Sequence, residues 1–253
     1  MESNSPLERY TMTRKKVARL CAQNRMEEAR EEWTRFLDSA FNYHTWDIVR
    51  TYAETCISQL PDHFKGYLAA GIACMNLQEY PSALTHFSKT LDICPGHVTA
   101  LHHMSEVLYG MDRYEEALQC AEMVRKYDPL HPEYIRLAVN NLVMLGRYQE
   151  SSDLIEAGLR VHPGNCALVL DKAMQMNILG EVKEAFEHFA RAEQLAREET
   201  LSPDLITNLI LIHLNRGYMR ASNNDKSGGN NEKEFGQVLI ELEKSKIAEY
   251  RSN

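Results

Sequence analysis

The fold is decided by the stretch "MDRYEEALQCAEMVRKYDP", which runs from Met111 to Pro129. The same layout returns 34 residues away in both directions, as "LQEYPSALTHFSKTLDICP" (Leu77–Pro95) and "LGRYQESSDLIEAGLRVHP" (Leu145–Pro163). Two further copies begin at Tyr43 and Leu179. Because all of these copies keep one register without an insertion, the chain contains an internal repeat.

Three kinds of residue recur in this register. A proline ends most copies, an aromatic residue stands near the start, and a small or slim residue follows three positions later. They are Pro61, Pro95, Pro129 and Pro163, then Trp46, Tyr80, Tyr114 and Tyr148, then Val49, Ala83, Ala117, Ser151 and Ala185. Apolar residues at helical intervals, ended by proline, predict a helix in each copy. A second amphipathic helix precedes each copy, with turn residues at or next to Asn76, Gly110, Gly146 and Gly180, so the unit is a pair of antiparallel helices.

The repeat resembles the tetratricopeptide repeat family in its length and in several signature residues. Tyr67, Gly71, Tyr80, Ala83, Phe87 and Pro95 fall on the family's aromatic, glycine, tyrosine, alanine, phenylalanine and proline positions, as do Gly146, Tyr148 and Pro163 in the third well-matched unit and Ala185, Phe189 and Ala192 in the fourth. The resemblance is strong from Phe64 to Arg197. Departures occur where Leu37, Ser105 and Val139 replace the signature glycine and Ser151 replaces the packing alanine.

One helix pair cannot bury its apolar stripe alone, so neighbouring pairs must stack. The resemblance implies an all-α, right-handed superhelical solenoid of antiparallel helix pairs, with about five to six repeats and a C-terminal capping helix. We expect a single domain over 1–253, with degenerate N-terminal repeats over 1–63 and four well-matched repeats over 64–197. A degenerate last pair follows over 198–253, with a flexible insertion at 221–233 and the capping helix.

Composition excludes several classes of protein. The 253 residues carry a net charge of −8, which does not suit a nucleic-acid-binding surface. The most apolar windows are far shorter than the roughly 20 residues of a membrane helix, and "MESNSPLERY" has no secretory layout. Six cysteines without a C-x-x-C pair predict reduced, mostly buried thiols. We therefore expect a cytoplasmic protein. We also expect the basic run Arg14–Lys16 to form a solvated first turn or capping face of a helix.

The sequence shows no catalytic constellation. It has no glycine-rich phosphate loop, no G-x-S-x-G and no H-E-x-x-H. His102 and His103 are adjacent, so on a helix we expect them to point in different directions. We therefore predict no catalytic residues, no metal site and no cofactor, and hence a protein that is not an enzyme.

The resemblance implies that the first helix of each pair lines a concave groove in which ligands bind. The inward-facing residues would be Lys65, Leu68, Ile72, Met75, His102, Glu106, Tyr109, Glu133, Arg136, Asn140, Val143, Leu170, Met174 and Asn177. The family subclass that grips a chaperone's C-terminal carboxylate uses lysine, asparagine and arginine on three units. Leu170 and Met174 cannot hold a carboxylate, which argues against such a clamp.

The groove that these residues predict suits an amphipathic helix or an extended peptide. We therefore expect a scaffold or adaptor, in a complex with one or more protein partners and without nucleic acid or membrane insertion. A co-chaperone that transiently shields apolar client segments is the alternative, and an enzyme hidden in a helical fold is a third reading that no residue cluster supports.

Overall fold

A computed structural model describes residues 6–41 and 45–198. All regular structure in these ranges is helical, in eleven helices without a strand, which confirms the all-α prediction. The chain divides into two compact units, Met1–Tyr127 and Asp128–Asn253. The single domain and the superhelix stay predictions. The expected last pair, the insertion at 221–233 and the capping helix lie outside the described residues.

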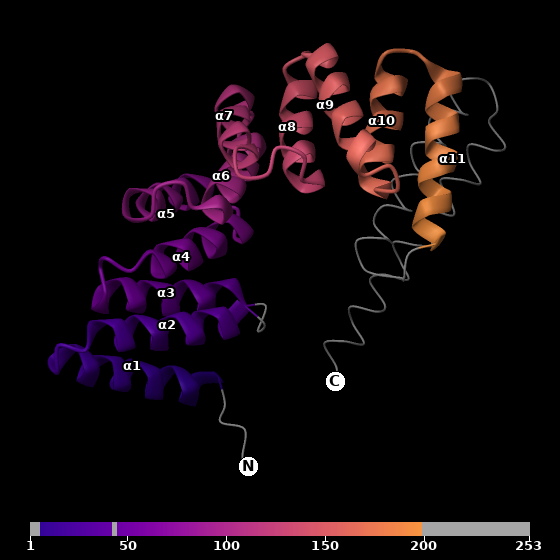
Figure 1. Ribbon diagram of the computed structural model, residues 1–253. Helices are drawn as coiled ribbons and strands as arrows, with labels where there is room; N and C mark the ends of the chain where they lie inside the picture. The colour runs from indigo at the N-terminus through magenta and orange to yellow at the C-terminus, as the bar shows by residue number, and fades with distance from the viewer. Residues whose placement is uncertain (1–5, 42–44, 199–253) are drawn as a thin grey trace. The chain divides into compact units, whose positions relative to one another are not determined.

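The first unit is a row of helices in which each helix packs against the next along the chain. These helices are α1 (Pro6–Ala22), α2 (Met26–Ala40), α3 (Trp46–Gln59), α4 (Phe64–Asn76), α5 (Tyr80–Ile93), α6 (Val98–Gly110) and α7 (Tyr114–Arg125). Figure 1 shows α1, α2 and α3 lying side by side in this order. In addition, α2 contacts α4 and α4 contacts α6, so the first helices of successive pairs form one layer.

The second unit repeats this arrangement. It contains α8 (Pro132–Met144), α9 (Tyr148–Val161), α10 (Cys166–Ile178) and α11 (Val182–Glu198). Neighbouring helices again pack in chain order, and α8 also contacts α10. The first helices of two successive pairs therefore touch in this unit as well.

The helix boundaries follow the 34-residue register. First helices begin at Phe64, Val98, Pro132 and Cys166, each 34 residues after the last, and second helices begin at Tyr80, Tyr114, Tyr148 and Val182. The slim positions of the repeat, Val49, Ala83, Ala117, Ser151 and Ala185, are all at most 1% exposed. This burial confirms the predicted helix pairs, because only a short side chain fits where two helices approach closely.

The turns inside the pairs differ from the prediction in one respect. Asn76 and Gly110 are the last residues of their helices, and the left-handed backbone comes two residues later, at Gln78 (φ 62°) and Asp112 (φ 57°). Gly146 and Gly180 occupy the equivalent turn positions with φ of 70° and 83°. The register therefore fixes the backbone conformation even where the residue is not glycine, at some cost in strain.

Close contact inside the pairs is achieved in two ways. Gly71 of α4 faces the buried ring of Phe87 in α5, and a Cβ atom added there would lie 2.6 Å from the ring. In the next pair Ser105 replaces this glycine, and its Oγ donates a hydrogen bond of 2.7 Å to the carbonyl of Ala117. The serine thus satisfies its own hydroxyl inside the core, which explains why the departure from the signature is tolerated.

Candidate functional site

The candidate site in the first unit is the layer of first helices, α2, α4 and α6, and we name its surface the first-helix face. A hollow of about 260 Å³ opens on this face. It is lined by Leu37, Asp38, Phe41, Lys65, Leu68, Ala69, Ile72, His97 and Thr99. Three of the residues predicted for partner contact, Lys65, Leu68 and Ile72, are therefore brought together by the structure.

The hollow combines apolar walls with an ion pair. Leu37 and Phe41 come from the α2 side, and Leu68 and Ile72 lie one helical turn apart on α4. Lys65 Nζ lies 3.0 Å from Asp38 Oδ1, so α2 and α4 are also joined by a partly exposed salt bridge. Burial, reinforced by the nearby Lys65 charge, lowers the pKa of His97 and keeps its ring neutral. The hollow suits one apolar side chain entering beside polar groups.

On α6, His102 and His103 share a neighbour, Glu106, that their adjacency in the sequence did not indicate. His103 Nδ1 lies 2.8 Å from Glu106 Oε2, and His102 Nε2 lies 3.5 Å from Glu106 Oε1. Partial burial alone would raise the pKa of Glu106, but hydrogen bonds and charge from His102 and His103 lower it to about 2. The Glu106 carboxylate is therefore ionised and held between two imidazole rings.

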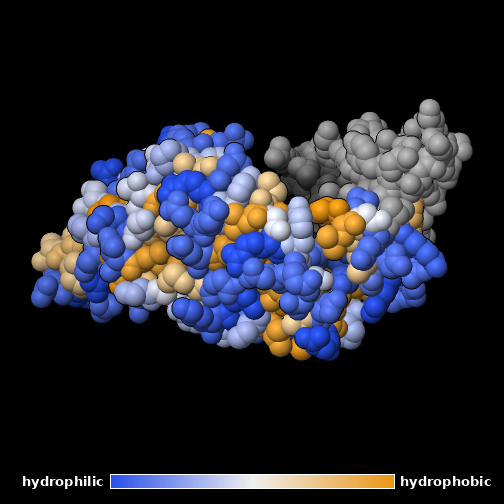
Figure 2. All heavy atoms as spheres, turned by 90° about the horizontal axis from the view of Figure 1, so that it is seen from above, coloured by the Kyte–Doolittle hydropathy of each residue, from blue (hydrophilic) through white to orange (hydrophobic). Residues whose placement is uncertain are grey.

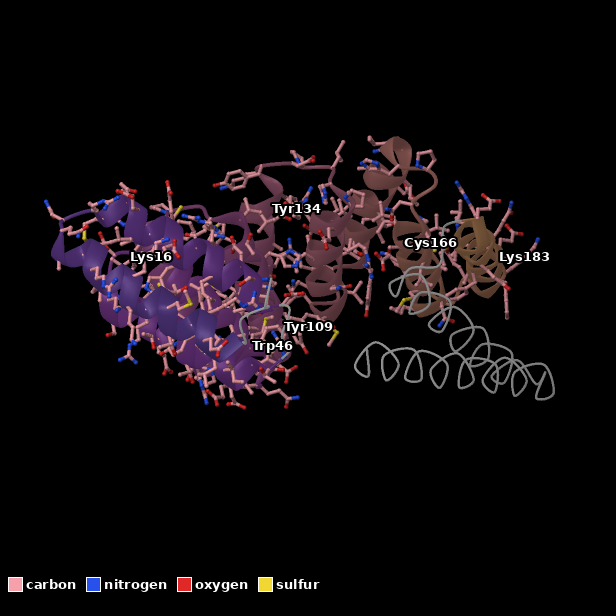
Figure 3. All side chains as sticks on the ribbon, turned by 90° about the horizontal axis from the view of Figure 1, so that it is seen from below. Lys16, Trp46, Tyr109, Tyr134, Cys166 and Lys183 are labelled. Carbon is pink, nitrogen blue, oxygen red and sulfur yellow. The ribbon has the colours of Figure 1, made fainter. Side chains whose placement is uncertain are left out.

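Tyr109 is the exposed aromatic residue of the same helix. Its side chain is 37% exposed, and its ring meets that of Tyr114 edge to face with centroids 5.4 Å apart. Figure 3 labels Tyr109 in the first unit. A half-exposed ring fixed by a neighbouring ring offers apolar contact area at a low cost in conformational entropy.

In the second unit the predicted residues fall into four environments. Arg136 of α8 donates from Nε to Asp171 Oδ2 of α10 at 2.9 Å, so its guanidinium group is engaged inside the protein. Leu170 is 1% exposed and packs in the core. Glu133, Asn140 and Met174 are exposed, whereas Val143 and Asn177 are half-buried. In this unit the surface available to a partner is therefore narrower than the sequence predicts.

A second, larger hollow of about 650 Å³ lies between α1 and α2. Its lining includes five cationic side chains, Arg9, Lys15, Lys16, Arg19 and Arg35, and one carboxylate, Glu32. Lys16 Nζ lies 2.6 Å from Glu32 Oε2, and Lys16 is labelled on α1 in Figure 3. The basic run Arg14–Lys16 is thus in the middle of α1, not in its first turn. The spacing of Lys15, Lys16 and Arg19 could have indicated this hollow, because residues three and four positions apart share one helix face.

The rest of the described surface is mixed in character. Figure 2 shows one face on which hydrophilic residues predominate and hydrophobic residues form separate patches. The six cysteines, all within the described residues, form no disulfide with one another, and burial raises the pKa of the Cys56 thiol to about 12. Among the described residues, no helix combines the length and apolar character that crossing a bilayer requires.

Comparison with known proteins defines the class of fold. The chain has the fold of tetratricopeptide-repeat proteins, as the predicted repeat implied. A tetratricopeptide repeat protein from Parabacteroides merdae aligns with a TM-score of 0.59 at 15% identity, over 93% of this chain and 98% of that one. PilF of Pseudomonas aeruginosa aligns with a TM-score of 0.62 at 15% identity, over 88% of this chain and 98% of that one.

Similarity in sequence is more limited. The protein STIP1 homolog of Dictyostelium discoideum is 28% identical over 95 residues. That stretch covers 38% of this chain and 17% of the relative, so this chain matches less than a fifth of that protein. No family model matches the chain.

Proposed function

We propose that the protein is a non-enzymatic scaffold or adaptor, a subunit of a larger protein complex, that holds a partner segment on its first-helix face. The observation that carries this proposal is the hollow between α2 and α4, where Lys65, Leu68 and Ile72 converge. Burial of one aliphatic or aromatic side chain in such a hollow contributes about 1.5–3 kcal/mol. That is enough to make it an anchor point for a peptide or helix.

Tyr109 supplies the second contact in this proposal. It lies on α6, which is the next first helix after α4 in the same layer. A partner segment with two apolar anchors, one for the hollow and one for Tyr109, would cross the first-helix face from one pair to the next. The polar groups Glu106 and Lys65 then set which polar residues the partner presents between its anchors.

The second unit offers a partner a separate contact surface in this proposal. Met174 is 37% exposed on α10, and a thioether side chain adapts to partners of different shape. Arg136 does not enter the proposal, because its charge is already matched by Asp171. The six cysteines, which form no disulfide with one another, support a reducing compartment such as the cytoplasm.

Affinity purification of the protein from its own cells tests this function. The variant carries Ile72→Gln and Tyr109→Ala, and the control carries Ile48→Gln and Met123→Ala on the second helices α3 and α7. Ile48 and Met123 are 44% and 43% exposed, so the control removes comparable apolar surface from the same unit. We expect one stoichiometric set of partners, lost in the variant and kept in the control.

Two outcomes would count against the proposal. If variant and control retain the same partners, contact does not occur on the first-helix face. If the intact protein recovers many substoichiometric clients, the alternative of a co-chaperone that shields apolar segments is favoured. Equal melting midpoints for variant and control would show that a loss of partners from the variant is not caused by unfolding.

A further inference from the structure

The cluster on α6 has a geometry that partner binding does not require. His102 and His103 are adjacent, so their side chains leave the helix about 100° apart. Glu106 follows one turn later, four residues after His102 and three after His103, and therefore lies between the two. As a result, one nitrogen from each ring and a carboxylate oxygen all lie within 4.8 Å of one another.

The separations between each histidine nitrogen and the Glu106 carboxylate are close to those of ligands around a single ion. Nitrogen and oxygen ligands bind Zn²⁺ at roughly 2.0–2.2 Å, so ligands that share an ion lie roughly 3–3.5 Å apart. His103 Nδ1 and Glu106 Oε2 are 2.8 Å apart, and His102 Nε2 and Glu106 Oε1 are 3.5 Å apart. Binding one ion would require the three side chains to rotate so that their ligand atoms point toward it.

The rings are held in place by their neighbours. His103 stacks on Phe87 with centroids 6.0 Å apart and an interplanar angle of 26°, and Phe87 is fully buried. His102 meets His103 edge to face at 5.5 Å. This packing limits the conformational entropy that the two imidazoles lose when they bind an ion. All three side chains are partly exposed, so an ion can reach them from solvent.

We propose that His102, His103 and Glu106 form a binding site for a divalent transition-metal ion of the Zn²⁺ class on the surface of α6. Two imidazoles and a carboxylate are ligands that Zn²⁺, Ni²⁺, Co²⁺ and Cu²⁺ all accept, whereas Mg²⁺ and Ca²⁺ prefer oxygen donors alone. Three protein ligands leave at least one coordination position for water or for a carboxylate or imidazole of another molecule. This proposal departs from the prediction of no metal site, and it does not depend on the proposed function.

Calorimetric titration of the metal-free full chain, without a histidine tag, tests the site directly with ZnCl₂ alone. We expect saturable binding of one Zn²⁺ per chain at the site. Replacement of one ligand, in His102→Ala or in Glu106→Gln, should weaken the affinity for Zn²⁺ at least about ten-fold. Even the loss of a residue that only hydrogen-bonds to a metal ligand typically weakens metal binding by this much. His162→Ala removes a histidine elsewhere in the chain and should leave the affinity unchanged.

Titration with CoCl₂ gives a second readout that a change in folding alone would not produce. Bound Co²⁺ should show visible absorption bands of a site with nitrogen and oxygen ligands, and these bands should disappear in both ligand variants. The proposal is overturned if no saturable binding occurs in the micromolar range. It is equally overturned if both ligand variants bind Zn²⁺ and Co²⁺ as the unmodified chain does. Circular dichroism of each variant establishes that the helices are intact.

Discussion

Arg136 on α8 donates a hydrogen bond from Nε to Oδ2 of Asp171 on α10 at 2.9 Å, and so ties the first helices of two successive pairs together. The Asp171 side chain is only 8% exposed, whereas that of Arg136 is 35% exposed. Burial raises the pKa of Asp171, and the charge and hydrogen bond of Arg136 oppose this effect. The ion pair therefore offsets the free-energy cost of burying the charged Asp171 carboxylate, which water hardly reaches.

Arg136→Ala should consequently destabilise the protein. The substitution leaves a buried carboxylate without its cationic partner, and breaking a buried ion pair in this way costs about 3–5 kcal/mol. Urea denaturation measures the change in the free energy of unfolding. Arg147→Ala is the matched control, because Arg147 pairs with Glu150 on an exposed surface and exposed pairs contribute little. If the two substitutions reduced the free energy of unfolding equally, Arg136 would not specifically stabilise the buried Asp171 carboxylate.

The contact between Gly71 and Phe87 predicts a second effect on stability. Gly71→Ala introduces a Cβ atom 2.6 Å from a fully buried ring, and overpacking of this kind costs about 1–3 kcal/mol. Gly110→Ala is the control, since its Cβ would lie 3.4 Å from Tyr80 at an ordinary contact distance. Alanine is also the better helix former, so this variant should be neutral or slightly stabilising. A melting midpoint that Gly71→Ala leaves unchanged would mean that α4 and α5 separate easily.

The repeat made most of the described fold predictable from sequence. Proline, aromatic and small residues at a fixed spacing determine where helices begin and which residues are buried, so Ala83 and Ala117 could be assigned to helix contacts in advance. The turns at Gln78 and Asp112 were harder to predict, because a left-handed backbone at these positions is imposed by the packed helices and not by the residue. Local propensity is overridden there by tertiary structure.

The candidate site was predictable only in part. Residues of the first helices could be assigned to one face from the register, and Lys65, Leu68 and Ile72 do share a hollow. The sequence did not predict the pairing of Arg136 with Asp171, which are separated by one repeat plus one residue. The adjacency of His102 and His103 does not by itself indicate the cluster, because Glu106, which contacts both, lies one turn later on α6.

Four half-buried or buried histidines predict that stability falls in mild acid. Burial lowers the pKa of His63, His86, His97 and His188 below the ordinary value of 6.5. Below about pH 6.5 the unfolded chain therefore binds more protons than the folded chain, and stability decreases as the pH falls toward the lowered pKa values.

Urea denaturation at about pH 7.5 and about pH 5.5 measures this effect. His63 is 5% exposed, so His63→Gln should reduce the difference between the two pH values. Stability that is equal at both pH values, or greater at the lower one, would show that these rings are protonated without cost in the folded protein.

The cysteines should differ in reactivity. Cys56 is fully buried, and burial raises its pKa to about 12, whereas Cys21 and Cys94 are half-buried. At about pH 8 a thiol reagent should therefore modify Cys21 and Cys94 well before Cys56, because the thiolate is the reactive form. Mass spectrometry of proteolytic peptides identifies the order in which the cysteines are modified. This order should disappear when the chain is unfolded in urea. Modification of Cys56 as fast as Cys21 in the folded protein would contradict the packing around α3.

The most direct test of the proposed function is photocrosslinking from two single positions in living cells. A photoreactive phenylalanine analogue replaces Tyr109 on α6 in one variant and Met123 on α7 in the other, and these residues are 37% and 43% exposed. Binding on the first-helix face predicts a defined crosslinked partner from position 109 and none from position 123. The same partner crosslinked from position 123 but not from position 109 would contradict the account.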